Sequence, residues 1–476
     1  MLMIGSLFLL HSCKKFTDIT PKGKNLLQKV DELETILNFN FNLNGSVQAG
    51  SAIAQTTAEN AFVFDDINLL INDHYTYLKN INTEIAAQVK TLDYAFITGD
   101  EAVNRAGLTA TDIKYSKMYF IVNNVANVVI ANADNAVGDR TKANQLKAEA
   151  YMIRAWMHYL LVNIYAKAYN KNTAVNDPGI PYVKEGIPIT EPNKKFTVAE
   201  VYANILADID AAFQLNGLPR IPVNSMRAGQ GFAYAAKARV LMSMGKYDEA
   251  LTAANQSLEI NSDVDDHRRY APVGTIAFAH PAVSGPEELF FAGGGPPYFR
   301  TVTVEIVNNY YEPGDIIKNY VNPYIDFSSF IGVPGGLTWF TTTYNRNTAG
   351  LNTSDTYLTK AECLIRAGGA SNIAAAMQII NYLRERRIHP SVYAPLTATT
   401  EAQAFAILKK FSRIEFLSTI KNFLNIKRWN TEDAYKETIS RTINGVTYQL
   451  KPESKLWIFP FPQNATDYNP NLSQNF

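Results

Sequence analysis

The sequence predicts a mainly α-helical protein in which a scaffold of paired helices carries a long, irregular, loop-rich lobe. Three observations indicate this fold. Apolar residues recur at three- and four-residue steps through residues 142–165, as on one face of a helix. Residues 231–261 and 356–387 each have the pattern of two helices joined by a small-residue turn. Between these pairs, residues 291–344 hold twelve aromatic residues, seven glycines and five prolines without a helical or strand period.

The first helix is expected from Lys142 to Tyr165. Its apolar stripe consists of Leu146, Ala150, Ile153, Met157, Leu160 and Ile164. A proline- and glycine-rich connector follows at 177–192, and Thr197 with Glu200 then forms the pattern of a capping box at a new helix start.

Residues 231–261 resemble a tetratricopeptide repeat, the 34-residue helix-turn-helix unit. Gly245 stands at the turn, Tyr247 packs after it, and Ala250 is the small residue that lets two helices approach closely. The pair at 356–387 fits this pattern more loosely, and a third helical stretch is expected from Ala402 to Ile420.

The amino terminus has the pattern of an export signal. Its apolar run, Leu2 to Leu10, is too short to span a membrane but fits a secretory signal, and Leu10-His11-Ser12-Cys13 resembles a bacterial lipobox. We expect residues 1–12 to be a lipoprotein signal peptide, Cys13 to be lipidated, residues 13–25 to be a tether, and residues 26–476 to form one domain. The alternative is a chance apolar terminus.

Composition and motifs argue against several function classes. Lys and Arg together number 44, as do Asp and Glu together, so the chain has no excess of positive charge that would indicate binding to nucleic acid. No HExxH, CxxC, GxSxG, GxGxxG or P-loop motif occurs, so we expect no catalysis, metal site or cofactor. Cys363 is expected in the core, the acidic stretch 263–266 in a solvated loop, and the pairs Asp65-Asp66 and Glu287-Glu288 as surface charge.

Five stretches in order resemble the SusD/RagB family of outer-membrane nutrient-uptake lipoproteins. They are the lipobox with FTDITPKGK, LKAEAYMIRAWMHYLLVNIYA, GIPYV, ARVLMSMGKYDEA, and a C-terminal block with TYLTKAECLIRAG, FSRIEFLSTIKNFLNIKRW and LKPESKLWIFPFPQNATDYNPNLSQN. The family commonly has a glycine where Thr419-Ile420-Lys421 stand here.

The resemblance implies a non-catalytic nutrient-binding protein, lipid-anchored at the cell surface in the outer membrane. Its scaffold would face a SusC-like TonB-dependent transporter, and its loops would capture a nutrient, most often an oligosaccharide. On this reading the scaffold lies mainly at 111–261 and 355–430, and the ligand lobe lies at about 48–109 and 262–354.

A neutral sugar is bound by flat aromatic rings flanked by side chains that hydrogen-bond its hydroxyls. The candidate ligand-binding residues with this chemistry are Trp339, Tyr298, Tyr310, Tyr311, Tyr344, Arg300, Asn309 and Arg346, with Tyr75 and Tyr77 in the early part of the lobe. Three alternatives stay open: the rings pack a small core, the nutrient is a peptide, or the chain is a repeat scaffold that binds only proteins.

Overall fold

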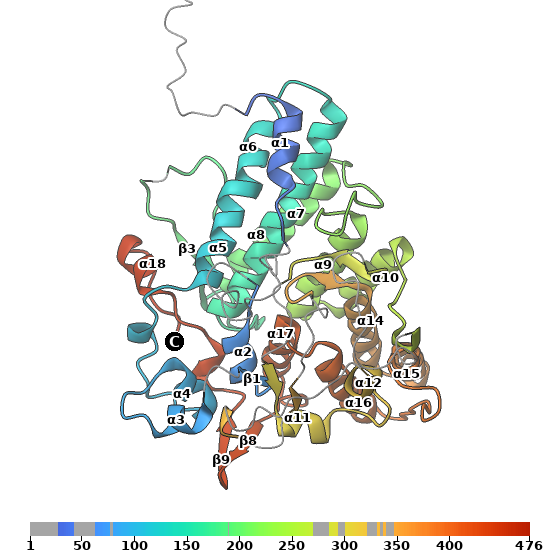
Figure 1. Cartoon of the computed structure of the whole chain (residues 1–476). Helices are drawn as coiled ribbons and strands as arrows, with labels where there is room; N and C mark the ends of the chain where they lie inside the picture. Colours follow the sequence, from blue (N-terminus) through green and yellow to red (C-terminus); the bar gives the residue numbers. More distant parts are fainter. Residues whose placement is uncertain are drawn as a thin grey trace, which may run out of the picture.

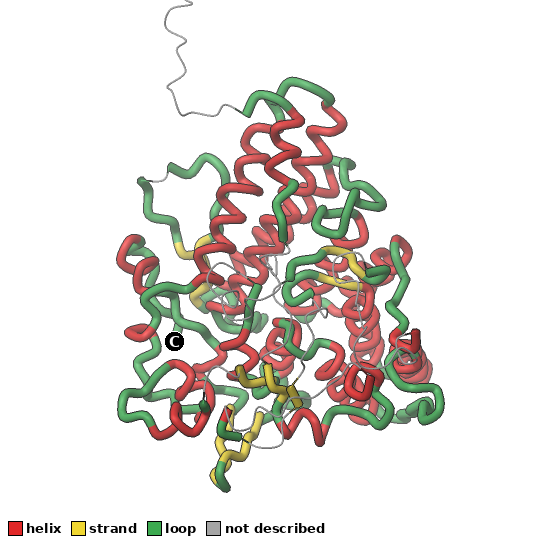
Figure 2. Tube along the Cα trace, viewed as in Figure 1, coloured by secondary structure: helices red, strands yellow, loops and turns green. Residues whose placement is uncertain are grey.

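Helices make up most of the described chain, and the few strands are short (Figure 2). The computed structural model describes residues 27–41, 62–76, 80–188, 190–269, 285–293, 300–320, 331–333, 337–338 and 347–476. The predictions for the signal peptide, Cys13 and the tether lie outside these residues, since the description begins at residue 27.

A group of long helices forms one end of the molecule (Figure 1). It contains α1 (Val30–Leu37), α5 (Ile113–Ile121), the π-turn η3 (Val122–Ala126), α6 (Asn127–Ala133), α7 (Arg140–Tyr165) and α8 (Val198–Gln214). The prediction for α7 is confirmed, although the helix begins two residues earlier, because the Asp139 carboxylate accepts a hydrogen bond from the Thr141 amide at 2.8 Å. The predicted capping box of α8 is also present: Thr197 and Glu200 each accept the other's backbone N–H.

The repeat-like pairs continue this row of helices. They are α9 (Gln230–Ser243) with α10 (Tyr247–Ile260), and α14 (Thr353–Ala367) with α15 (Ala370–Glu385). Helix α10 packs on both α9 and α14, so segments about a hundred residues apart in sequence lie side by side. Gly245 turns the chain between α9 and α10 at φ +74°, a conformation that favours glycine.

The helix expected from Ala402 to Ile420 is confirmed as far as Glu415 and is wrong beyond it. Helix α16 ends at Glu415, and a separate helix α17 runs from Ile420 to Trp429. Between them Ser418 adopts a left-handed φ of +62°, and the Thr419 hydroxyl accepts the Lys421 amide at 3.1 Å. This cap begins α17 at a new angle, which the apolar periodicity did not show.

The described part of the lobe consists of short elements. They are α2 (Asp65–Leu70), β1 (His74–Thr76), α3 (Ile81–Ala86), α4 (Leu92–Thr98), η2 (Ala106–Leu108), β4 (Glu288–Phe290), β5 (Arg300–Val302), α11 (Val304–Asn309), α12 (Ile316–Tyr320), β6 (Leu337–Thr338) and β7 (Leu351–Asn352). Strands β1, β5 and β6 form an antiparallel sheet in which Tyr75 lies opposite Thr301. Strand β4 pairs antiparallel with β7. The early and late parts of the lobe therefore meet in one sheet.

The remaining elements cover the edges of the helical body. They are β2 (Pro178–Pro181), β3 (Lys195–Thr197), β8 (Ile439–Ile443), β9 (Val446–Leu450), η5 (Lys455–Trp457) and α18 (Gln463–Tyr468). Strands β8 and β9 form a hairpin that the sequence analysis did not anticipate, with Asn444 and Gly445 at its tip at φ of +50° and +78°.

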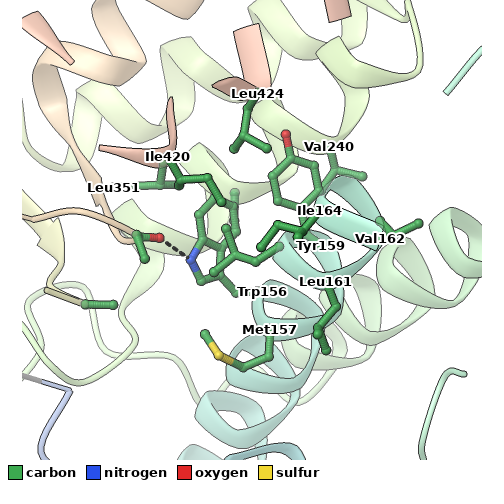
Figure 3. Packing of buried hydrophobic residues seen from close by; sticks show 14 of the residues in the cluster. Trp156, Met157, Tyr159, Leu161, Val162, Ile164, Val240, Leu351, Ile420 and Leu424 are labelled. Atoms are coloured by element: carbon green, nitrogen blue, oxygen red, sulfur yellow. Dashed lines mark hydrogen bonds between the residues drawn. The ribbon is translucent and has the colours of Figure 1, made fainter. Parts of the chain in front are cut away.

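A continuous apolar core surrounds α7 (Figure 3). The whole predicted stripe of α7 is buried, and the opposite faces are buried as well, because α5, α6 and α8 all pack on this helix. Trp156 is only 3% exposed, and its indole N–H donates to the Ala349 carbonyl at 2.8 Å. Trp429, Trp457 and Cys363 are also buried, as expected for residues with structural roles.

Candidate functional site

A small cavity lies where the described part of the aromatic segment meets the helical scaffold. Tyr310 and Tyr311, directly after α11, line one side, and Glu287 and Glu288 at the start of β4 line another. Its volume is about 70 Å³, room for a few water molecules rather than for a sugar ring. The cavity is therefore too small for a sugar ring, and we call the charged residues that line it the polar floor.

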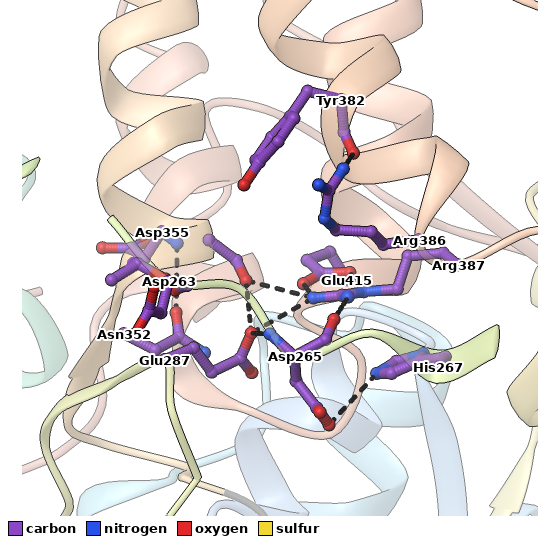
Figure 4. Close-up of polar contacts among 12 residues, drawn as sticks. Asp263, Asp265, His267, Glu287, Asn352, Asp355, Tyr382, Arg386, Arg387 and Glu415 are labelled. Atoms are coloured by element: carbon purple, nitrogen blue, oxygen red, sulfur yellow. Dashed lines mark hydrogen bonds and ion pairs between the residues drawn. The ribbon is translucent and has the colours of Figure 1, made fainter. Parts of the chain in front are cut away.

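A network of buried charges forms this floor (Figure 4). The Arg387 guanidinium, just after α15, donates to both carboxylate oxygens of Glu415 at 2.9 and 2.7 Å and to Glu287 at 3.3 Å. Glu287 also accepts from the Ser354 hydroxyl at 3.0 Å and from the Asp265 amide at 3.2 Å.

Two expectations about acidic residues are wrong here. Glu287 is 5% exposed and Asp265 is fully buried, so neither is the surface or loop charge that its sequence context suggested. The physical reason is the charged partners that each carboxylate meets. The Arg387 guanidinium, a hundred residues further along the chain than Glu287, lies 3.3 Å from the Glu287 carboxylate, and the Asp265 carboxylate pairs with the Arg269 guanidinium at 2.5 Å.

Burial raises the pKa of two further carboxyl groups beside this network. Burial and the neighbouring Glu287 raise the pKa of Glu288 well above its ordinary value, and the Asn347 amide donates to the Glu288 carboxylate. Burial raises the pKa of Asp315 to about 7. Burial also lowers the pKa of Lys421, which is 2% exposed, and its ammonium forms no hydrogen bond or ion pair with the described residues.

A second polar chain links the lobe to the scaffold. Arg300 on β5 donates to Asp65 at 2.5 Å, and Asp65 lies 3.2 Å from His74, whose other ring nitrogen lies 3.2 Å from the Ser418 hydroxyl. Burial opposes ionisation of Asp65, but the Arg300 charge and the His74 hydrogen bond outweigh it and hold its pKa below the ordinary value. Asp66 pairs with Lys114 at 2.6 Å, so the expectation of free surface charge at this acidic pair is wrong as well.

The candidate ligand residues fall into two groups. Tyr77, Tyr298, Trp339, Tyr344 and Arg346 lie outside the described residues.

The other five candidates are described. Tyr310 is half-buried with the Arg413 guanidinium 5.7 Å from its ring centre, Tyr311 is 7% exposed, and Asn309 is exposed. Arg300 is held by Asp65, and Tyr75 is 3% exposed within the sheet. The structure therefore brings Tyr310 and Tyr311 together at the cavity and gives Arg300 and Tyr75 packing partners.

Sequence reasoning missed the residues that form the floor of the site, above all Asp315, Arg387 and Lys421. Each stands in an ordinary helical or loop context, and nothing in the sequence shows that three distant segments converge. Glu287-Glu288 was the one visible signal, because an acidic pair directly before the apolar residues Leu289, Phe290 and Phe291 is drawn into the interior with them.

Two family models match the chain. One, described as starch-binding associating with outer membrane, matches residues 28–242, and the other, described as the SusD family, matches residues 306–476. Neither model covers residues 243–305, which lead into the aromatic segment and contain its first part. No protein of established annotation matched the chain.

Solved structures with the same fold cover nearly the whole chain. A SusD superfamily protein from Bacteroides thetaiotaomicron is 17% identical, with a TM-score of 0.69 over 94% of this chain and 100% of its own. A putative sugar binding protein from Bacteroides vulgatus is 18% identical, with a TM-score of 0.66 over 95% of this chain and 99% of its own. A SusD-like carbohydrate binding protein from Bacteroides vulgatus is 15% identical, with a TM-score of 0.63 over 94% and 98%.

The described helices include none that is long and apolar enough to cross a bilayer. Among the described residues no group of His, Cys, Asp and Glu has an arrangement suited to a metal ion. The helical pairs, the two family models and the shared fold agree with one another, and the chain belongs to the SusD/RagB family.

Proposed function

We propose that this protein binds an uncharged oligosaccharide at the cell surface and delivers it unchanged to a TonB-dependent outer-membrane transporter. The observation that carries the proposal is the match of two SusD-type family models to both halves of the chain. Two proteins of the same fold are described as sugar or carbohydrate binding, which supports the ligand class.

The geometry of the lobe agrees with this ligand class. Half-buried Tyr310 follows exposed Asn309 at the edge of a floor whose charged groups mostly face one another, whereas Tyr311 is 7% exposed and packs among apolar side chains. Aromatic faces stack on sugar rings, and an amide hydrogen-bonds to hydroxyls. We include Trp339 and Tyr344 of the same segment in the proposed site because of their residue types.

The test is migration of a soluble form lacking residues 1–13 through native gels that contain candidate neutral polysaccharides. We expect at least one polysaccharide to retard the wild type, Trp339→Ala to lose most of this retardation, and Tyr310→Ala to weaken it. Tyr468→Ala is the matched control, because Tyr468 is 88% exposed and lies on α18 away from the cavity. If the protein migrates freely in every polysaccharide gel but binds peptides, the nutrient is a peptide and not a sugar.

Two further measurements test the rest of the proposal. Incubation with a retarding glycan should release no reducing ends, because the protein carries its ligand without cleaving it. The wild type should also co-purify with a TonB-dependent outer-membrane barrel from its own cells, and failure to do so would contradict the delivery step.

A further inference from the structure

A second and much larger hollow lies away from the aromatic segment. Its walls are the loop after α7, the end of α17, and two C-terminal segments at 452–458 and 474–476, near the chain end marked C in Figure 1. Its volume is about 790 Å³, within the range of sites that hold small ligands. We call it the C-terminal hollow.

The buried charged side chains in its walls are already held by groups of the protein. The Lys167 ammonium lies 2.7 Å from the Asp177 carboxylate, which also accepts from the Thr173 hydroxyl at 2.6 Å. Lys427 is buried and donates to the carbonyls of residues 163 and 166 at 2.6 and 2.7 Å. The other two charged residues, Glu453 and Lys455, are exposed and opposite in sign. Lys427 has no carboxylate partner among the described residues, but its ammonium already donates to two carbonyls.

The hollow does offer a fixed aromatic ring. Phe476 is 38% exposed, and the Arg105 guanidinium lies 3.9 Å from its ring centre, covering one face. Arg105 is itself 2% exposed and is held by the carbonyls of Ile458 and Lys455 at 2.6 and 3.1 Å. Because the fixed Arg105 guanidinium covers only one face of the Phe476 ring, the other face can stack on a ligand that presents C–H groups.

One hydrogen-bond donor in the wall is unused. Asn430 accepts the Glu437 amide on Oδ1 at 3.0 Å, but its buried Nδ2 has no hydrogen-bond partner among the described residues. A buried donor without a partner costs about 1–3 kcal/mol, and a hydroxyl of a bound molecule would satisfy it.

We infer that the C-terminal hollow is a second binding site, for one or two neutral sugar units of the glycan. An open face of Phe476, an unused amide at Asn430 and buried cations already held by carbonyls are features that suit an uncharged, hydroxyl-rich ligand. This inference rests on the proposed function, since it assigns a second site to the same class of ligand.

The experiment measures glycan affinity by gel retardation and calorimetry in variants that separate the two sites. Phe476→Ala should weaken binding of the retarding glycan about three- to tenfold. Asn430→Asp keeps the Oδ1 acceptor and removes the Nδ2 donor, so it should weaken binding as well. Tyr468→Ala again serves as the control, as an exposed aromatic of the same terminal region that does not line the hollow.

Binding that remains in Trp339→Ala should disappear in the double variant Trp339→Ala/Phe476→Ala. If Phe476→Ala and Asn430→Asp both bind like the wild type while Trp339→Ala does not, the second site is overturned and the proposed function stands. If the wild type binds no glycan, both are overturned. Thermal melting of each variant, expected within about 2 °C of the wild type, shows whether a loss of binding reflects unfolding.

Discussion

Single ionisable residues in the interior make this protein sensitive to pH. His158 on α7 is fully buried, with Nδ1 2.9 Å from the Arg154 carbonyl and Nε2 accepting the Val183 amide at 3.0 Å. These contacts hold a neutral ring with its proton on Nδ1. Burial lowers the pKa of His158 to about 3.

We therefore expect acid to destabilise the protein through His158. Between pH 6.5 and 3 the unfolded state binds a proton that the folded ring does not, so stability falls as the pH falls through this window. From pH 7.5 to 5.0 this residue should account for a loss of about 2 kcal/mol. Urea unfolding of the wild type and His158→Gln at the two pH values measures it, and an equal loss in both proteins would contradict the assignment.

Asp315 makes stability change with pH in the opposite direction to His158. Because its pKa is raised to about 7, stability is lost as the pH rises from about 4, where the unfolded carboxyl ionises, to 7, where the folded one does. Asp315→Asn keeps an acceptor for the Lys318 amide, 2.8 Å away, and removes the buried charge. We expect this variant to be about 1–3 kcal/mol more stable than the wild type at pH 8 and nearly equal to it at pH 4, measured by urea unfolding.

At the scale of helices, one buried carboxylate joins elements that are distant in sequence. Glu362 on α14 accepts both Arg428 nitrogens of α17 at 2.7 Å, Arg366 at 2.8 Å and the Trp429 indole at 3.1 Å. Burial alone would raise the pKa of Glu362, but Arg428 and Arg366 lower it to about 2. The contact therefore fixes α17 on the repeat-like pair.

Glu362→Gln should lower the free energy of unfolding by about 3 kcal/mol at pH 7, because the buried Arg428 guanidinium loses its counter-charge and Arg366 keeps only Glu432. The wild-type advantage should be present above about pH 4.5 and disappear as the pH falls toward 2. Glu249→Gln, at an exposed carboxylate on α10, is the control and should change stability by less than about 0.5 kcal/mol. Equal effects of the two variants would show that the α14–α17 contact is dispensable.

The turn between α9 and α10 can be tested by substitutions that probe its backbone conformation alone. A Cβ at Gly245 would meet no atom within 4 Å, so Gly245→Ala probes only the cost of φ +74°. We expect a loss of about 1 kcal/mol, and a smaller loss for Gly245→Asn, since asparagine tolerates left-handed backbone better. Thermal melting of the two variants measures both, and alanine as stable as glycine would contradict this role of the turn.

At the scale of the whole molecule, helical pairs form a body on which the loop-rich lobe is mounted. Strands β1 and β5 join the two parts of the lobe to each other, and the Arg300–Asp65–His74–Ser418 chain and the floor around Arg387 join the lobe to that body. These contacts cross between segments hundreds of residues apart. They support the proposal that the helices present the aromatic segment to its ligand.

Membrane attachment is the property of the whole molecule that the lipobox predicts. Cys13→Ala should abolish incorporation of labelled fatty acid and release the protein from the membrane fraction, because a peripheral chain without acyl groups keeps no stable anchor. Radiolabelling and fractionation of cells that express the two forms measure this. Equal labelling of wild type and variant would refute lipidation at this cysteine.

The sequence by itself determined the helices, because apolar periodicity, the capping box at Thr197 and the turn at Gly245 are local patterns. It also pointed to the family through motifs spread along the chain. Tertiary structure alone decided that α16 and α17 separate at Ser418, that β8 and β9 form a hairpin, and that Asp265 and Glu287 are buried. Burial of a charge depends on which side chains meet it, and Arg387 reaches the Glu287 carboxylate and the Asp265 carbonyl only in the folded chain.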